Sequence, residues 1–319
     1  MRDFYGREID YMRISITDRC NLRCIYCMPQ KIESVPMSEI LTYEEIAEIV
    51  KAAVQLGISH YRITGGEPLV RKGCFKLVRL LKEIPGVKTV GMTTNGVLLA
   101  EHAQALQKAG LDSINVSLDT VDPGRFKEMA GSDSLCHVLK GIDEAKQVGL
   151  PVKINTVNCL GTEWAPLLEF AEKKNIPIRF IEMMPIGYGK NHMGNSNEQL
   201  IKMMEERYGN GRAVEAIYGN GPAKYMRFER LNVDVGFISA LHHKFCGSCN
   251  RIRLSAEGFL KLCLCYDAGI DLRSTLRDPE GSEALVQIMK QAIYHKPMEH
   301  CFDESSEMTE KEPMIRIGG

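Results

Sequence analysis

Short apolar segments alternate with amphipathic helical segments from residue 12 to about residue 182, and this alternation constrains the fold most. Six strand–helix units in a row predict an α/β fold with a parallel sheet and right-handed crossovers. Because eight such units close a barrel, six predict a partial barrel. The expected strands are Met12–Thr17, Tyr61–Thr64, Thr89–Thr93, Ser113–Leu118, Val152–Val157 and Ile178–Met183. The expected helices are Thr42–Gln55, which begins with a capping box, Phe75–Glu83, Leu99–Ala109, Arg125–Met129, Leu135–Val148 and Trp164–Lys174.

Polar, glycine-rich or otherwise unusual residues follow most of these strands, at the edge where a parallel sheet places its ligand site. Because the carboxyl ends of parallel strands lie together, we predict that these residues form one site. They are Cys20 after the first strand, Gly65-Gly66-Glu67-Pro68 after the second, Thr93-Thr94-Asn95-Gly96 at the third, Ser117 and Asp119 at the fourth, and Met183-Met184-Pro185 at the sixth.

The regular alternation of strand and helix segments ends near Gly187, and polar and glycine-rich segments follow. A polar helix is expected over Ser196–Tyr208, followed by glycine turns and short strand-like runs at Tyr225–Glu229 and Val233–Ile238. We therefore assign residues 1–186 to the barrel core and residues 187–319 to a smaller, irregular module that closes over the barrel mouth. The polar tail from residue 304 to residue 319 is expected, by composition alone, to be frayed.

Composition narrows the class of protein. With 40 basic and 41 acidic residues, the net charge of −1 gives no reason to expect nucleic acid or a membrane surface as a partner. The first residues contain no apolar signal segment and no run is long enough to span a membrane, so we expect a cytoplasmic protein. Eleven cysteines, an odd number, then favour metal or redox chemistry over a disulfide framework.

Three of the cysteines, Cys20, Cys24 and Cys27, form a C-x3-C-x2-C loop directly after the first expected strand. Iron–sulfur clusters are held by cysteine thiolates, so three thiolates on a four-iron cluster leave one iron open for a small molecule. A structural zinc site is the alternative, but such sites prefer paired C-x2-C knuckles and four ligands. The spacing therefore favours an iron–sulfur reaction site.

A second set, Cys246, Cys249 and Cys263, has the spacing C-x2-C-x13-C and also supplies three thiolates. Cys265 is not counted as a ligand, because Leu264 and Tyr266 flank it as neighbours do in an alternating strand. A zinc site completed by His242 or His243 is the alternative. Two open clusters would bring two small molecules together. The remaining cysteines lie in apolar or helical surroundings and are expected to be small hydrophobes and not ligands, namely Cys74, Cys136, Cys159 and Cys301.

Two arginines lie inside the second cysteine set, between Cys249 and Cys263. In a strand, Arg251 and Arg253 face the same side and make a site suited to a polyphosphate, because each guanidinium can bind two oxygens. Arg13, on the first strand, adds a third cation. The alternative is a solvated edge strand. No phosphate loop of the Walker type and no Ser-His-Asp signature is present, so an ordinary kinase or hydrolase site is not expected.

The first cysteine loop and the turn at Gly65–Pro68 together resemble the radical S-adenosylmethionine (SAM) superfamily, in which SAM chelates the open iron. Over essentially its whole length the chain also resembles the GTP 3′,8-cyclase family of molybdenum-cofactor biosynthesis. The resemblance implies a partial (β/α)6 TIM-type barrel of the radical SAM kind with a C-terminal cluster-binding module. It also implies two four-iron clusters. The matching segments are Arg13–Asn21, Arg62–Pro68, Thr93–Gly96, Asn115–Asp119, Phe180–Glu182, Phe245–Leu254 and Gly318-Gly319.

The same resemblance implies the site residues. SAM would be contacted by Tyr26, Gly66, Ser117 and Met184. GTP would be contacted by Arg13, Arg62, Thr93, Lys153, Arg251 and Arg253, with Arg179 as a further cation, and Arg13, Arg251 and Arg253 would be catalytic. The first cluster would be ligated by Cys20, Cys24 and Cys27, and the second by Cys246, Cys249 and Cys263, with its open iron meeting the guanine base. His60 stands where many relatives carry a basic residue, so its role is left open.

The reaction implied by the resemblance begins with cleavage of SAM to a 5′-deoxyadenosyl radical, which takes the 3′-hydrogen of the GTP ribose. The ribose carbon then attacks C8 of guanine and gives (8S)-3′,8-cyclo-7,8-dihydroguanosine 5′-triphosphate. The implied partners are a reduced flavodoxin- or ferredoxin-type electron donor and cyclic pyranopterin monophosphate synthase as the next enzyme, while a homodimer is left open. The glycine end of the tail is implied to reach into the site.

Two alternatives belong to other functional classes. A peptide-modifying radical SAM maturase shares the first cysteine loop, but would show more clustered C-terminal cysteines and a peptide-docking module. A non-catalytic electron carrier would offer four cysteines for each cluster, which neither set does.

Overall fold

The computed structural model describes residues 1–28, 33–215, 218–278, 281–303 and 307–318. Its centre is a run of parallel strands in which the C-terminal segment contributes one strand to each side of the six strands expected from the sequence. These strands are β1 (Tyr11–Ser15), β2 (His60–Thr64), β3 (Thr89–Thr94), β4 (Ser113–Ser117), β5 (Val152–Asn158), β6 (Ile178–Glu182), β9 (Val235–Ile238) and β10 (Arg251–Leu254).

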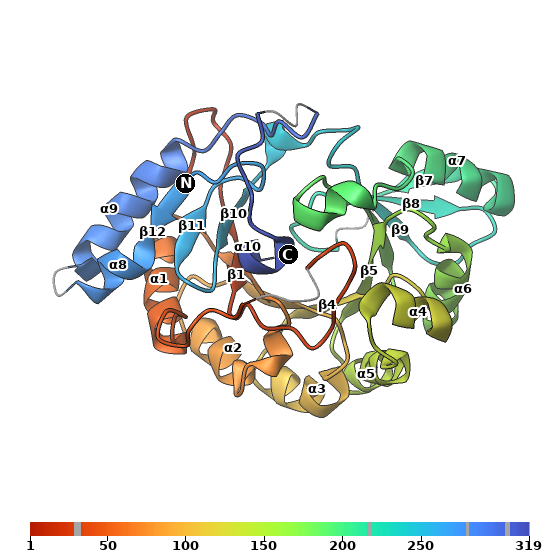
Figure 1. The fold of residues 1–319 in the computed structure, drawn as a ribbon, viewed down its shortest axis with the longest axis horizontal. Coiled ribbons are helices and arrows are strands. Elements are labelled where there is room, and N and C mark those ends of the chain that lie inside the picture. The colour runs from red at the N-terminus through yellow and green to blue at the C-terminus, as the bar shows by residue number, and fades with distance from the viewer. Residues whose placement is uncertain (29–32, 216–217, 279–280, 304–306, 319) are drawn as a thin grey trace.

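Antiparallel strands complete both ends of the sheet. They are β7 (Gly211–Val214), β8 (Lys224–Phe228), β11 (Phe259–Lys261) and β12 (Gly269–Asp271). The order is β12-β11-β10-β1-β2-β3-β4-β5-β6-β9-β8-β7, and among the described residues no pairing joins β12 to β7. The sheet curls without closing (Figure 1), so the partial barrel predicted from the sequence is confirmed.

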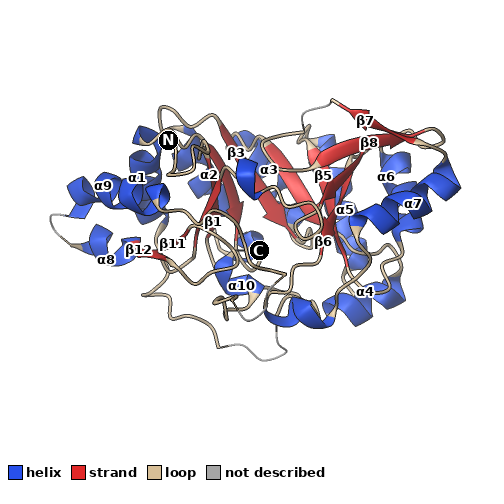
Figure 2. Ribbon diagram, turned by 90° about the horizontal axis from the view of Figure 1, so that it is seen from above, coloured by secondary structure: helices blue, strands red, loops and turns tan. Residues whose placement is uncertain are grey.

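Helices cover the convex face of the sheet, as Figure 1 shows, and in the view of Figure 2 α9 and α1 lie at one end and α6 and α7 at the other. The outer helices are α1 (Tyr43–Gln55), α2 (Cys74–Lys82), α3 (Leu99–Lys108), α4 (Pro123–Ala130), α5 (Leu135–Gln147), α6 (Trp164–Lys174), α7 (Asn197–Tyr208), α8 (Leu272–Arg277) and α9 (Gly281–Tyr294). The short helix α10 (Met314–Ile317) lies instead on the concave side of the sheet (Figure 1). Short 3-10 turns occur at η1 (Pro68–Val70), η2 (Gly187–Asn191) and η3 (Cys246–Ser248). No helix within the described ranges is long and apolar enough to cross a membrane.

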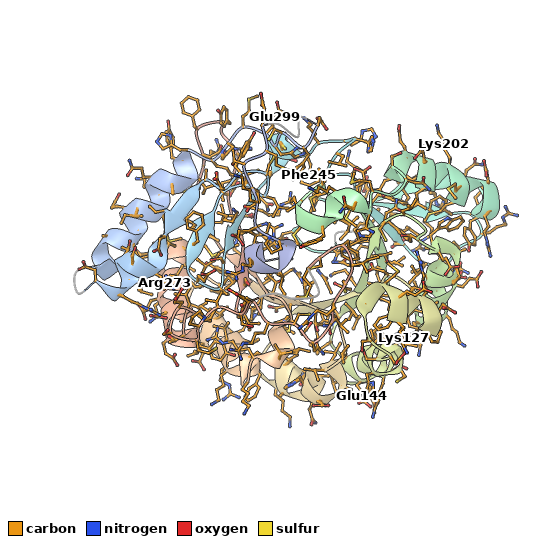
Figure 3. All side chains as sticks on the ribbon, viewed as in Figure 1. Lys127, Glu144, Lys202, Phe245, Arg273 and Glu299 are labelled. Atoms are coloured by element: carbon orange, nitrogen blue, oxygen red, sulfur yellow. The ribbon has the colours of Figure 1, made fainter. Side chains whose placement is uncertain are left out.

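The main core lies between the sheet and these helices. Every second strand residue points outward into it, among them Met12, Ile14, Ile63, Met92 and Ile114, none of which is exposed to solvent. The start of α1 follows the expected capping box: the Thr42 hydroxyl accepts a hydrogen bond from the Glu45 amide, and the Glu45 carboxylate accepts one from the Thr42 amide. Charged residues labelled on the outer helices, Lys127, Glu144, Lys202 and Arg273, lie at the periphery (Figure 3).

The C-terminal segment is more regular than its glycine-rich texture suggests. It extends the barrel sheet on both sides, and α9 was not anticipated. It therefore does more than close over the mouth, because β10 pairs directly with β1 inside the sheet. The boundary between residues 186 and 187 stays a prediction.

Candidate active site

The concave face of the sheet is polar. Its residues alternate with the outward apolar ones, as the pleat of a strand requires. Register places Arg13 beside both Arg62 and Arg253, and Tyr11 beside Arg251, so the two arginines of β10 face the same side as those of β1 and β2, as predicted. Other strands of this face contribute Thr93, Ser113, Asn115, Ser117, Lys153, Asn155 and Arg179.

Two glycines make room for the longest of these cations. A Cβ at Gly91 would lie 2.7 Å from an Arg62 terminal nitrogen, and one at Gly236 would lie 2.7 Å from the Arg179 Cγ. Arg62 Nε donates to the Tyr11 hydroxyl at 2.7 Å, and Arg179 Nε donates to the Asn155 side-chain oxygen at 2.9 Å. The guanidiniums are thus held by neutral acceptors, which leaves their charge uncompensated.

The cations lie close enough to affect one another. Burial, with Arg62, Arg251 and Arg179 nearby, lowers the pKa of Arg13 to about 10. Burial, reinforced by Arg179 and Arg62, lowers the pKa of Lys153 to about 8. Among the described residues no ion pair joins Arg62, Lys153, Arg179, Arg251 or Arg253 to a carboxylate. The chemistry of the concave face is therefore suited to a multiply charged anion.

The first cysteine loop follows β1 and rests on the end of α4, where the Ile25 amide donates to the Met129 carbonyl at 3.0 Å. The Cys27 amide donates to the Cys24 carbonyl at 3.0 Å, so the loop folds back on itself. Burial raises the pKa of Cys27 to about 12, with the nearby thiol of Cys20 and the Asp119 carboxylate adding to it. Because burial keeps these thiols protonated, they would become thiolates only when iron binds, as in an iron–sulfur cluster.

The glycine turn after β2 packs against this loop. A Cβ at Gly66 would lie 2.4 Å from the Arg19 carbonyl oxygen, and one at Gly65 would lie 2.7 Å from the Thr17 oxygen. Neither glycine has a positive φ, so close approach and not turn geometry requires them. The buried Glu67 carboxylate accepts hydrogen bonds from the Thr94 hydroxyl and the amides of Asn95 and Leu69, and so ties the turn to β3.

The residues expected to contact SAM lie around the same end of the strands. Tyr26 donates its hydroxyl hydrogen to Asp119 at 2.5 Å, and the other Asp119 oxygen accepts from the Val157 amide at 2.8 Å. Ser117 closes β4, and Met184 follows β6 and is half-buried. The structure thus brings the first cysteine loop, the glycine turn and the ends of β4 and β6 to one edge, as the sequence predicts.

The second cysteine set lies at η3 and after β11. Burial alone would raise the pKa of Cys249, but Arg251 and Lys296 outweigh it and lower the pKa to about 7. Arg251 also lies over the Phe245 ring, 4.6 Å from its centroid. Burial is the main cause that raises the pKa of Cys246, and the nearby thiols of Cys249 and Cys263 add to it, so the three thiols lie near one another. This donor set fits an iron–sulfur cluster.

The zinc alternative finds no support in the two histidines. His242 Nδ1 lies 3.0 Å from the Glu182 carboxylate, and His243 Nε2 lies 3.7 Å from that of Glu198. In the part of the chain that the structure describes, no three His, Cys, Asp or Glu side chains converge as ligands of one metal ion. The spare cysteine, Cys265, is buried with its sulfur 2.8 Å from that of Cys301.

The two cysteine sets lie at opposite ends of the paired strands β1 and β10. Cys20 follows the carboxyl end of β1, whereas Cys249 precedes the amino end of the parallel strand β10. The expectation of a single site at the barrel mouth is therefore incomplete, because the arginines occupy the interior between two ends. His60 begins β2 and contacts the Thr89 hydroxyl at 2.8 Å, and burial lowers its pKa.

The tail is ordered in the described range, contrary to the expectation from its composition. Ile315 and Ile317 in α10 are 2% and 3% exposed, and α10 lies on the concave side of the sheet in Figure 1. The Gly318 carbonyl accepts a hydrogen bond from Arg253, while Gly319 lies outside the described residues. Arg316 does not point to the other arginines: it donates to the Glu33 carbonyl at 2.9 Å.

Sequence reasoning missed four polar residues of the concave face: Tyr11, Asn115, Asn155 and Tyr225. Tyr11 and Asn155 hold arginines, while the Asn115 side-chain oxygen and the Tyr225 hydroxyl are buried with no hydrogen-bond partner among the described residues. The alternation of polar and apolar residues could have revealed Asn115 on β4 and Asn155 on β5. On β4, for example, Ser113, Asn115 and Ser117 alternate with apolar neighbours.

Comparison with known proteins agrees with this geometry. The chain matches the family model of the radical SAM superfamily over residues 14–173 and the model named Molybdenum Cofactor Synthesis C over residues 176–302. The fold and the cysteine loop after β1 define a radical SAM enzyme. A GTP 3′,8-cyclase of Clostridium perfringens is 41% identical over 326 residues, and one of Petrotoga mobilis is 43% identical over 328 residues, with full coverage of both chains in each case. The chain belongs to the GTP 3′,8-cyclase family.

Solved structures resemble the fold at lower sequence identity. Streptococcus suis SuiB bound to S-adenosylmethionine gives a TM-score of 0.64 at 15% identity, covering 97% of this chain and 77% of SuiB. SuiB bound to its precursor peptide SuiA gives a TM-score of 0.66, also at 15% identity, and covers 97% of this chain and 75% of SuiB. At this identity the likeness concerns the fold alone.

Proposed function

We propose that the protein converts GTP into (8S)-3′,8-cyclo-7,8-dihydroguanosine 5′-triphosphate, the first step of molybdenum-cofactor biosynthesis. The observation that carries the proposal is the cluster of cations on the concave face, which lies between two sets of three thiols. In the described part of the chain, no ion pair with a carboxylate is formed by Arg62, Lys153, Arg179, Arg251 or Arg253. A triphosphate provides the compensating charge, and its nucleoside would span the space between the sets.

At the first set, Cys20, Cys24 and Cys27 would hold a four-iron cluster, and SAM bound there supplies the 5′-deoxyadenosyl radical that takes the ribose hydrogen. The chain would provide position. SAM would be oriented by Tyr26, which is fixed by Asp119, and by Gly66, which packs against the cysteine loop, together with Ser117 and Met184. Fixed groups of this kind make a reaction between two bound molecules effectively unimolecular.

At the second set, Cys246, Cys249 and Cys263 would hold a second four-iron cluster whose open iron takes the guanine base. The lowered pKa of Cys249 supports this, because a thiolate and not a thiol binds iron. The triphosphate would be bound by Arg13, Arg62, Thr93, Lys153, Arg179, Arg251 and Arg253. A peptide substrate has no comparable need for these cations, which argues against the maturase alternative.

The proposal extends to partners. A reduced flavodoxin- or ferredoxin-type protein would supply the electron to the first cluster, and cyclic pyranopterin monophosphate synthase would take the product. The experiment that tests the function is anaerobic incubation with SAM, dithionite and each nucleoside triphosphate in turn. We expect 5′-deoxyadenosine and a cyclised nucleotide in equal amounts with GTP. Equal 5′-deoxyadenosine from all four triphosphates, without a cyclised product, would contradict it.

Replacing Arg251 or Arg253 with Ala should weaken GTP binding by roughly 1.5–3 kcal/mol, the range for hydrogen bonds to charged groups. Lys should restore only part of the loss, because an ammonium lacks the planar fork of a guanidinium. Equilibrium dialysis of the reconstituted protein with GTP measures the effect, and SAM binding is the control that should stay constant. Unchanged GTP affinity in both Ala variants would return these residues to the role of solvated strand residues.

GTP binding should also weaken as the pH rises through about 8. The pKa of Lys153 is lowered to about 8 by burial and by its neighbouring cations, so the free protein loses this charge above that pH. A bound triphosphate favours the ammonium, which means that binding takes up a proton and affinity falls as protons become scarce. Binding measured between about pH 7 and pH 9 checks this. In Lys153→Arg, the GTP affinity should vary with pH only as far as GTP's own ionisable groups titrate. The same pH dependence in Lys153→Arg would assign the effect to another group.

A further inference from the structure

An arginine near the start of the chain lies outside every role described so far. Arg7 is 7% exposed and precedes β1, at the end of the barrel where the second cysteine set lies. Its guanidinium donates to four backbone carbonyls of the C-terminal segment. The acceptors are Cys246 at 3.0 Å and Met298 at 2.7 Å for Nη1, and Lys296 at 3.2 Å and Pro297 at 2.7 Å for Nη2.

A carboxylate holds this guanidinium in place. Arg7 Nε donates to Asp3 Oδ2 at 2.6 Å, and both side chains are almost fully buried, 4% and 0% exposed. The other Asp3 oxygen accepts from the amides of Arg7 and Tyr5 at 2.9 and 3.1 Å, which fixes the turn that carries the arginine. The charge is therefore paired and every guanidinium nitrogen has an acceptor, as a buried arginine requires.

The second cysteine set comes from two segments, or arms: one carries Cys246 and Cys249, and the other carries Cys263. The contacts of Arg7 reach both arms. Arg7 binds the carbonyl of Cys246 itself. It also binds the carbonyl of Lys296, whose buried ammonium donates to the carbonyl of Leu262, the residue before Cys263. Cys246 and Cys263 are 17 residues apart in sequence, and they are joined through one guanidinium and one ammonium.

From these contacts we infer that Arg7 is a positioning residue for the second cluster: with Asp3 and Lys296 it fixes the separation of the two cysteine arms before iron binds. The inference rests on the second cluster of the proposed function. Groups that orient metal ligands through hydrogen bonds hold the ligand geometry, and their loss typically lowers metal affinity about 10–100-fold. Phe245 and Glu299, labelled on the upper side of the molecule in Figure 3, flank the two segments that Arg7 joins.

The test is the rate at which a chelator removes iron from the anaerobically reconstituted full-length protein. Wild type should show two phases, each of about four irons. In Arg7→Ala the phase assigned to the second set should become about 10–100 times faster, while the other phase and SAM binding stay as in wild type. Arg7→Lys should be intermediate, because three donors cannot meet all the acceptors that a guanidinium meets. Arg2→Ala removes an exposed arginine from the same segment and is the matched control.

The possible outcomes distinguish the role of Arg7 from the existence of the second cluster. A single four-iron phase in wild type would remove the second cluster and the inference with it. Two phases in wild type that stay within twofold in Arg7→Ala would overturn the role of Arg7 alone. Equal acceleration of both phases in Arg7→Ala and Arg7→Lys would show a general folding effect and would also overturn a local role. Asp3→Asn keeps the arginine but replaces its charged partner with a neutral amide. Faster iron loss in the second phase alone of this variant would support the role of Arg7.

Discussion

Cys24→Ala should abolish cleavage of SAM, whereas Cys249→Ala should leave uncoupled SAM cleavage in place and remove the second cluster. Cys24 lies in the middle of the first loop, where burial raises its pKa well above the usual range, with Asp119, Cys27 and Cys20 adding to it. Ionising such a thiol requires a strong positive partner such as iron, and with one ligand gone a cluster with an open iron is not held.

Iron analysis and the yield of 5′-deoxyadenosine read out this prediction. Wild type should hold about eight irons per chain and each variant about four, because each set serves one four-iron cluster. Cys265→Ala is the matched control, since its thiol is buried against Cys301 and belongs to neither set, so iron content should stay at the wild-type level. Stoichiometric zinc without iron at the second set, in protein kept free of oxygen, would contradict the two-cluster assignment.

Local patterns in the sequence predicted the frame of the fold well. Each of the six expected strands is present within one or two residues of its expected ends, because short apolar segments between amphipathic helices bury their apolar side most readily as strands packed against those helices. Thr42 and Glu45 also form the expected cap, because a capping box needs only residues three positions apart.

Long-range pairing was beyond such patterns. No local signal says that Arg251–Leu254 pairs with β1, and only that pairing places the two cysteine sets at opposite ends of the barrel. The acceptors of the arginines were missed for a related reason. Tyr11 and Asn155 are ordinary strand residues until the register brings Arg62 and Arg179 beside them. Composition alone gave the wrong expectation for the tail, because most of its residues are polar, although Ile315 and Ile317 are buried. The resemblance, in contrast, implied that the glycine end reaches into the site, and Gly318 does contact Arg253.

Removing Gly318 and Gly319 should cut the yield of cyclised product at least about tenfold, because the loss of one hydrogen bond to a charged group, roughly 1.5–3 kcal/mol, corresponds to a factor of ten or more. The Gly318 carbonyl accepts a hydrogen bond from Arg253, and without this bond the guanidinium would be less well held in the position that we propose for binding the triphosphate. Thermal stability should hardly change, because Ile315 and Ile317 remain to anchor α10. Product analysis by mass spectrometry, with iron content and a melting curve on the same sample, measures all three quantities.

Gly318→Ala separates the backbone of the tail from its length. Gly318 has a φ of +79°, and a Cβ there would lie 3.3 Å from the Ser15 Cβ and 3.6 Å from the Thr64 Cγ2. An alanine would therefore have to strain or shift the end of the tail away from β1 and β2, and the yield should fall as in the truncated protein. Pro313→Ala is the control, since Pro313 precedes α10 and its replacement leaves the glycine end intact. If the truncated protein turns over GTP at the full-length rate, the contact between Arg253 and Gly318 has no part in the reaction.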